Sequence, residues 1–194
     1  MISKGQTLVN PVTGERMTFL ETSAETSGEY VRIELHAEPH ASVAAAHVHP
    51  AQIEKFDVVW GTLGAKVAGK RIEAQRGDVL VVEPGQAHKW WNAGEGELVF
   101  RCELRPALQF ESLIETMFAL AAAGKTNKKG MPNPFRLAVI AKAHFDTVRL
   151  PFPPAPLQRA ALASGAPLGK LLGYEPTYPQ ALSPEAAGAL SAGS

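Results

Sequence analysis

The spacing of apolar side chains changes at Pro106, which divides the sequence into a strand-rich part and a helical part. Within residues 28–38, Val31, Ile33 and Leu35 alternate with polar neighbours, and this two-residue period is typical of a strand with one buried face. Residues 12–21 have the pattern of a hairpin with Thr13-Gly14 at its turn. Further short apolar segments, each bounded by Gly, Pro or Asn, span residues 53–61, 65–74, 77–85, 88–92 and 97–104. Many brief strands joined by regular turns predict a β-sandwich or barrel.

Helical periodicity begins after Pro106. The segment 107–124 places its larger apolar side chains, Leu108, Leu113, Met117 and Leu120, along one stripe and ends at a glycine. Asn133-Pro134 has the composition of a helix cap and first turn, and it predicts a second helix over residues 135–148.

The proline-rich segment 151–156 breaks the chain again, and residues 158–174 form a weaker, glycine-interrupted helical pattern. We therefore expect a β domain at 1–105 and a helical extension at 106–194 that includes this proline-rich linker. The last dozen residues are rich in Ala, Ser and Gly, and we expect a mobile tail there.

Composition narrows the class of protein. The 194 residues are 45% hydrophobic, enough for a core, and their net charge of zero gives no reason to expect a nucleic-acid partner. The single cysteine, Cys102, excludes an intrachain disulfide, and its apolar surroundings predict a buried thiol. No apolar run approaches the length of a transmembrane segment, and the N-terminus lacks a signal-peptide core. These features predict a soluble, cytoplasmic protein.

The segment HVHPAQIEKF, residues 47–56, carries the main candidate chemistry. On a strand, His47 and His49 point to the same face, so two imidazoles can reach one point. Glu54 has the opposite parity on a continuous strand, but Pro50 interrupts the strand. After that break, the face that Glu54 shares with its alternate neighbours can turn back toward the histidines.

A third imidazole comes from His88, at the start of a later strand. Three imidazoles and one carboxylate inside a small barrel form a mixed nitrogen and oxygen site. Such a site suits iron, manganese, nickel, copper, cobalt or zinc better than calcium or magnesium. Four protein ligands on an octahedral metal leave two positions for water, dioxygen or a bidentate substrate.

Together these residues resemble the two motifs of the cupin superfamily. The first motif, HxHx4Ex6G, is matched by His47, His49, Glu54 and Gly61, and the second by Gly77, Gly85, His88 and Asn92. The sequence departs from the family pattern at Ala41, where a glycine is usual, and at Pro84, which is displaced by one position. The region after residue 105 resembles the helical extension of some bacterial single-cupin proteins.

The resemblance implies a mainly β protein: a cupin-type double-stranded β-helix, or jelly-roll barrel, with C-terminal α-helices. It implies His47, His49, Glu54 and His88 as the metal ligands. It also implies a homodimer, because family members pair through their sheets.

Four more residues are candidates for the substrate pocket. Gln52 and Phe56 share the face of Glu54; Gln52 either orients a ligand or forms ordinary hydrogen bonds at the barrel mouth. Trp90 and Asn92 have the parity of His88. Trp90 either walls the pocket or packs in the core, and Asn92 either fixes a strand end or faces the pocket. We expect the other histidines, His36, His40 and His144, to be solvated or packed.

The leading hypothesis is a metal-dependent enzyme that acts on a small organic molecule held in the barrel. It is either an oxygenase, and thus an oxidoreductase, or a non-redox isomerase, cyclase or lyase in which the metal is a Lewis acid. In either case Glu54 is also a candidate catalytic base. The alternative is a module that binds or senses a small ligand without turnover.

Overall fold

The computed structural model describes residues 2–179. The tail predicted at the C-terminus begins outside these residues. The strands are β1 (Thr7–Asn10), β2 (Glu15–Glu21), β3 (Val31–Ala37), β4 (Ile53–Trp60), β5 (Thr62–Val67), β6 (Lys70–Gln75), β7 (Val79–Val82), β8 (His88–Asn92) and β9 (Leu98–Arg105). The helices are α1 (Phe110–Ala122), α2 (Pro134–Ala143) and α3 (Ala155–Leu171).

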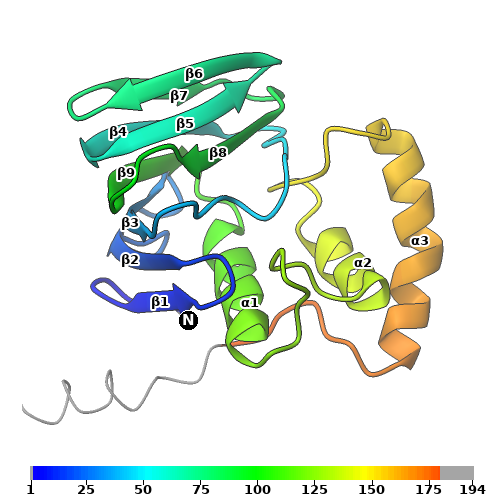
Figure 1. Cartoon of the computed structure of the whole chain (residues 1–194). Helices are drawn as coiled ribbons and strands as arrows, with labels where there is room; N and C mark the ends of the chain where they lie inside the picture. Colours follow the sequence, from blue (N-terminus) through cyan, green and yellow to red (C-terminus); the bar gives the residue numbers. More distant parts are fainter. Residues whose placement is uncertain (1, 180–194) are drawn as a thin grey trace, which may run out of the picture.

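The nine strands form two antiparallel sheets that face each other as a jelly-roll barrel (Figure 1). The larger sheet has the order β1-β2-β3-β9-β4-β7, and the smaller has the order β6-β5-β8. The strand-like segments predicted from the sequence lie on these strands, except that residues 65–74 form the end of β5, a turn and most of β6 instead of one segment. The helices lie together to one side of the barrel in Figure 1, with α2 flanked by α1 and α3.

The core lies between the two sheets, and the two-residue period of the sequence decides which side chains enter it. In β3, Val31, Ile33 and Leu35 are buried while Arg32 and Glu34 are only partly covered. Strand β9 pairs with both β3 and β4, so it is an interior strand of the large sheet. Its side chains Phe100, Cys102 and Leu104 are buried, whereas Arg101 is exposed and Glu103 is only partly covered, so one face of β9 points into the core.

Gly61 forms the tight connection between β4 and β5. Its φ is +82°, and a Cβ at this position would lie 2.7 Å from the carbonyl oxygen of Glu97. Because only glycine combines this conformation with so close an approach, the glycine of the first sequence motif has a structural explanation.

The helices agree with the sequence in part. The side chain of Asn133 accepts a hydrogen bond from the backbone N–H of Arg136, which confirms the predicted cap of α2. Helix α3, however, begins at Ala155 inside the proline-rich segment and continues past Pro167. The early start is tolerated because Pro156 lies in the first turn, where its missing N–H has no helical partner to lose.

Backbone pairing connects the extension to the barrel. In the segment that contains the two histidines, the backbone of His47 pairs with His88 of β8. The next residue, Val48, pairs on the opposite side with Arg149. Val48 and Arg149 exchange two backbone hydrogen bonds of 2.9 and 3.0 Å. The chain after α2 therefore continues the sheet next to the histidine segment. None of the helices in residues 2–179 has the length and apolar character needed to cross a membrane.

Two glycines of α3 provide a matched test of helix packing. A Cβ at Gly169 would lie 2.5 Å from the carbonyl oxygen of Phe135, whereas a Cβ at Gly165 would meet only Ala138, at 3.4 Å. We expect Gly165→Ala to stabilise the protein by up to about 1 kcal/mol through helix propensity. Gly169→Ala should instead destabilise it by about 1–3 kcal/mol, because α2 and α3 must separate. Chemical denaturation of both variants checks this; equal effects would contradict the close helix contact.

Candidate metal centre

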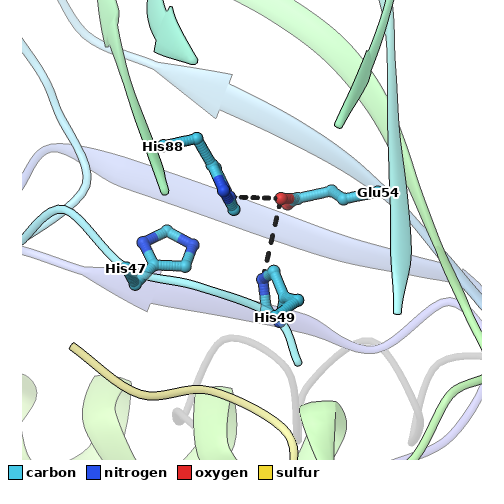
Figure 2. Close-up of side chains that lie close together, drawn as sticks. All are labelled: His47, His49, Glu54 and His88. Carbon is cyan, nitrogen blue, oxygen red and sulfur yellow. Dashed lines mark ion pairs between the residues drawn. The ribbon is translucent and has the colours of Figure 1, made fainter. Parts of the chain in front are cut away.

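Four side chains from separate segments converge at one end of the barrel interior (Figure 2). His47 and His49 come from the segment paired with β8, Glu54 from β4 and His88 from the first position of β8. A bend at Pro50 separates the histidines from β4, as the parity of the sequence requires. One ligand atom from each of the four residues lies within 4.8 Å of the others.

The backbone holds each imidazole by its Nδ1 atom. This atom lies 3.0 Å from the carbonyl oxygen of Ala45 in His47, and 3.0 Å from that of Gln86 in His88. In His49 it lies 2.7 Å from the carbonyl oxygen of Thr147. A carbonyl oxygen only accepts hydrogen bonds, so each Nδ1 must carry the proton. When the rings are neutral, the three Nε2 atoms keep their lone pairs for a ligand.

Three of the four ligand atoms of the cluster make no hydrogen bond of ordinary geometry. Nε2 of His49, Nε2 of His88 and Oε2 of Glu54 are buried and make no directed hydrogen bond. The two nitrogens lie 3.6 and 2.7 Å from that oxygen (Figure 2). Buried polar atoms are rarely left without a partner, because desolvation is then uncompensated. A transition-metal ion is a suitable partner for this donor set, so the residues fit a metal.

The electrostatics of the cluster also favour deprotonated ligands. Burial, together with the charges of His88 and His49, lowers the pKa of His47 to about 4. Burial by itself would raise the pKa of Glu54, but contact with His88 and the nearby imidazoles outweigh it and lower this pKa to about 2. At neutral pH, His47 is therefore neutral and Glu54 is ionised.

His88 behaves differently because of its short contact with Glu54. Burial would lower the pKa of His88, but the carboxylate outweighs burial and raises it. The carboxylate therefore favours a proton on Nε2 of His88, the atom that would also bind a metal.

Two side chains that touch the metal-binding candidates fix their positions. Gln52 is fully buried, and its Oε1 lies 3.0 Å from Nδ1 of His49. Its Nε2 donates to the carbonyl oxygens of Pro106 and Ala107. Gln52 therefore links His49 to the start of the extension. The thiol of Cys102 is buried as predicted, and it lies 3.4 Å from Oε1 of Glu54 as a hydrogen-bond donor.

Of the other three pocket candidates, two line a cavity and one does not. Phe56 and Trp90 line a cavity that adjoins the cluster. The side chain of Asn92 is outside that lining; it donates to the carbonyl oxygens of Ala37, Glu38 and Gly96 and accepts from Gly94. These bonds fix the end of β8.

The sequence did not predict that residues of the helical extension contact the metal-binding candidates and line the cavity. Thr147 supplies the carbonyl that orients His49, from a position 98 residues away. His144 is packed, as expected, but its ring also lines the cavity. A single sequence carries no signal for contacts of such separation.

A two-sheet barrel with three histidines and one glutamate at its interior defines a class of small β-barrel proteins with a candidate metal site. Comparison with known families is consistent with this class: residues 33–102 match the model of the cupin domain. Residues 33–102 are therefore a cupin domain, as the two motifs predicted. No curated protein matches the sequence.

Several solved structures are similar to part of this chain. A predicted oxalate decarboxylase from Thermotoga maritima is 20% identical, with a TM-score of 0.48 over 55% of this chain and 99% of the other. An RmlC-like cupin from Shewanella frigidimarina is 17% identical, with a TM-score of 0.48 over 55% and 88% of the two chains. A sugar phosphate isomerase of the cupin superfamily from Silicibacter pomeroyi is 19% identical, with a TM-score of 0.44 over 50% and 62%.

Proposed function

We propose that this protein is a metal-dependent enzyme that acts on a small organic molecule held between the barrel and the helices. The proposed ligands are His47, His49, Glu54 and His88. The observation that carries the proposal is the convergence of four ligand atoms, three of them without an ordinary hydrogen bond. They lie beside a cavity that His47, His49 and Glu54 line. A molecule in this cavity would reach the metal directly.

A metal at this site would supply Lewis acidity toward a substrate oxygen or, if it is iron or copper, redox chemistry with dioxygen. The residues of the chain do the rest. The backbone carbonyls and Gln52 orient the imidazoles, and the Cys102 thiol holds one oxygen of Glu54. Glu54 is also the candidate base, since it is ionised at neutral pH and lines the cavity.

Mass spectrometry of a cellular small-molecule extract distinguishes an enzyme, which converts a compound, from a module that only binds one. The extract is incubated with metal-loaded protein and, in parallel, with the His88→Ala variant. We expect at least one compound to be consumed and a new one to appear only with the wild-type protein. A compound that is retained and released unchanged would instead identify a binding or sensing module.

Metal binding should release a proton and weaken as pH falls. A metal at Nε2 of His88 displaces the proton that Glu54 stabilises there, so affinity should fall about tenfold per pH unit below the raised pKa of His88. Below about pH 4, protonation of His47 should steepen this loss. Isothermal titration calorimetry in buffers of different ionisation enthalpy counts the released protons. An affinity that is constant between pH 5 and 7 would contradict the coupling.

We further propose that the chain divides into a barrel at 1–105 and an extension at 106–194, and that side chains from both parts line one cavity. The homodimer, the cytoplasmic location and the oxidoreductase class stay predictions.

A further inference from the structure

The cavity beside the cluster has walls from both parts of the chain. Its volume is about 480 Å³, which is within the range of small-molecule sites. The barrel contributes Phe56, Trp90 and Phe100 to its lining. Helix α1 contributes Ile114 and Met117, and α2 contributes Leu137 and Ile140. The extension therefore closes the open end of the barrel with apolar side chains.

Most polar side chains of the extension that line the cavity already have partners in the protein. Nδ1 of His144 donates to the carbonyl oxygen of Ile140, and its Nε2 lies 3.2 Å from the hydroxyl of Ser112. The amide of Gln158 donates to the carbonyl oxygen of Leu150 at 2.9 Å. These groups have little capacity left to bind a polar substrate.

The polar groups that the first hairpin contributes are partnered in part. Oδ1 of Asn10 accepts from the backbone N–H groups of Val12 and Thr13. Glu15 is buried, and it accepts a hydrogen bond from the Thr13 hydroxyl. Among the fully buried polar atoms that lack a partner in residues 2–179, those at the cavity all belong to the metal cluster.

One cation also lines the cavity. Arg149 is half-buried, its backbone pairs with Val48 between the two histidines, and it forms no ion pair with any carboxylate in residues 2–179. Its position beside the histidine segment would favour an anionic group at the cluster end of the cavity.

On these grounds, and resting on the proposed metal site, we infer that the substrate is a mainly apolar organic molecule with a single acidic oxygen head group. The head group binds at the cluster, and the apolar remainder lies against α1 and α2. A sugar or another polyhydroxylated molecule fits this cavity poorly, because its hydroxyl groups would lose their hydration without gaining partners.

Two hydroxamic acids test this substrate class, since they share a metal-binding head group and differ only in the apolar tail. Octanohydroxamate has six more methylenes than acetohydroxamate, and each buried methylene adds about fourfold in affinity. We expect octanohydroxamate to bind at least about 50-fold more tightly in isothermal titration calorimetry, even if only half of the added methylenes are buried. A ratio below about threefold would overturn the inference.

A pair of substitutions on α2 locates the tail. Ala141 lines the cavity, whereas Ala143 on the same helix is exposed and is not part of the lining. Ala141→Phe should weaken octanohydroxamate at least about tenfold by filling the space of the tail, with acetohydroxamate unchanged. Ala143→Phe should change neither affinity. Two results would place the tail elsewhere: unchanged octanohydroxamate affinity in Ala141→Phe, or weaker binding of both probes in Ala143→Phe.

Chelator-treated protein separates this inference from the proposed function. Without metal, octanohydroxamate should still bind saturably through its tail and remain sensitive to Ala141→Phe, while acetohydroxamate should lose its binding. If the short probe never depends on metal, the proposed metal site fails. If acetohydroxamate binding depends on metal but octanohydroxamate binds no more tightly, only the inferred substrate class is wrong.

Discussion

The His47→Ala/His49→Ala double variant is expected to bind zinc or cobalt roughly 10⁴-fold more weakly than the wild-type protein. Four-ligand zinc sites have apparent binding free energies of about 10–16 kcal/mol, or about 3 kcal/mol for each ligand, so the loss of two imidazoles removes about 6 kcal/mol. Their hydrogen bonds through Nδ1 leave Nε2 of both rings available to a metal, and Nε2 of His49 lies 3.6 Å from Glu54. Competition with a chromophoric chelator measures the affinity.

A matched control removes two other histidines. His36 contacts Glu97 on the barrel surface, and His40 is exposed, so His36→Ala/His40→Ala should leave metal affinity unchanged. Metal should also raise the unfolding temperature of the wild type and of this control, because it binds only the folded state. Equal metal affinities in the two double variants would refute the assigned ligands.

The second large effect concerns stability and involves Glu15 on β2. Burial raises the pKa of this carboxyl to about 7, although the hydrogen bond from Thr13 lowers it slightly. A raised folded-state pKa contributes stability below the ordinary pKa of 4.5, and this contribution is lost as pH rises through 7. Glu15→Gln should therefore be more stable than the wild type by about 3 kcal/mol at pH 8, and nearly equal to it at pH 4.

Denaturant unfolding at several pH values, in the presence of a chelator, measures this difference. The chelator removes the separate effect of metal on Glu54 and the histidines. Glu83→Gln, which changes an exposed carboxyl of the barrel, is the control, and its stability should parallel that of the wild type. A difference between Glu15→Gln and the wild type that does not change with pH would mean that Glu15 is ionised or hydrated in the folded protein.

Local sequence patterns were sufficient for most of the barrel. The alternation of Val31, Ile33 and Leu35 predicted β3 and its buried face, because parity on a strand depends only on neighbouring residues. The interruption at Pro50 explained how Glu54 faces the same interior as His49. The convergence of the candidate ligands followed from the same parity, supported by the spacing of the two cupin motifs.

The contribution of the extension could not be predicted in this way. The pairing of Val48 with Arg149 and the bond from His49 to Thr147 join residues about a hundred positions apart. Helicity was predicted for residues 107–124 and α1 spans Phe110–Ala122, so Leu108 of the predicted stripe lies outside the helix; which wall the helix forms depends on packing. Similarly, the start of α3 at Ala155 was missed because prolines break a helix interior but are favourable in its first turn.

X-ray absorption spectroscopy of the zinc-loaded protein tests the central claim most directly. Four-residue ligation by His47, His49, His88 and Glu54 predicts a first shell of nitrogen and oxygen at about 2.0–2.2 Å, with the outer-shell scattering of three imidazoles. Cys102 is close enough to Glu54 to offer an alternative ligand. A sulfur distance of about 2.3 Å, or scattering from fewer than two imidazoles, would contradict the proposed centre.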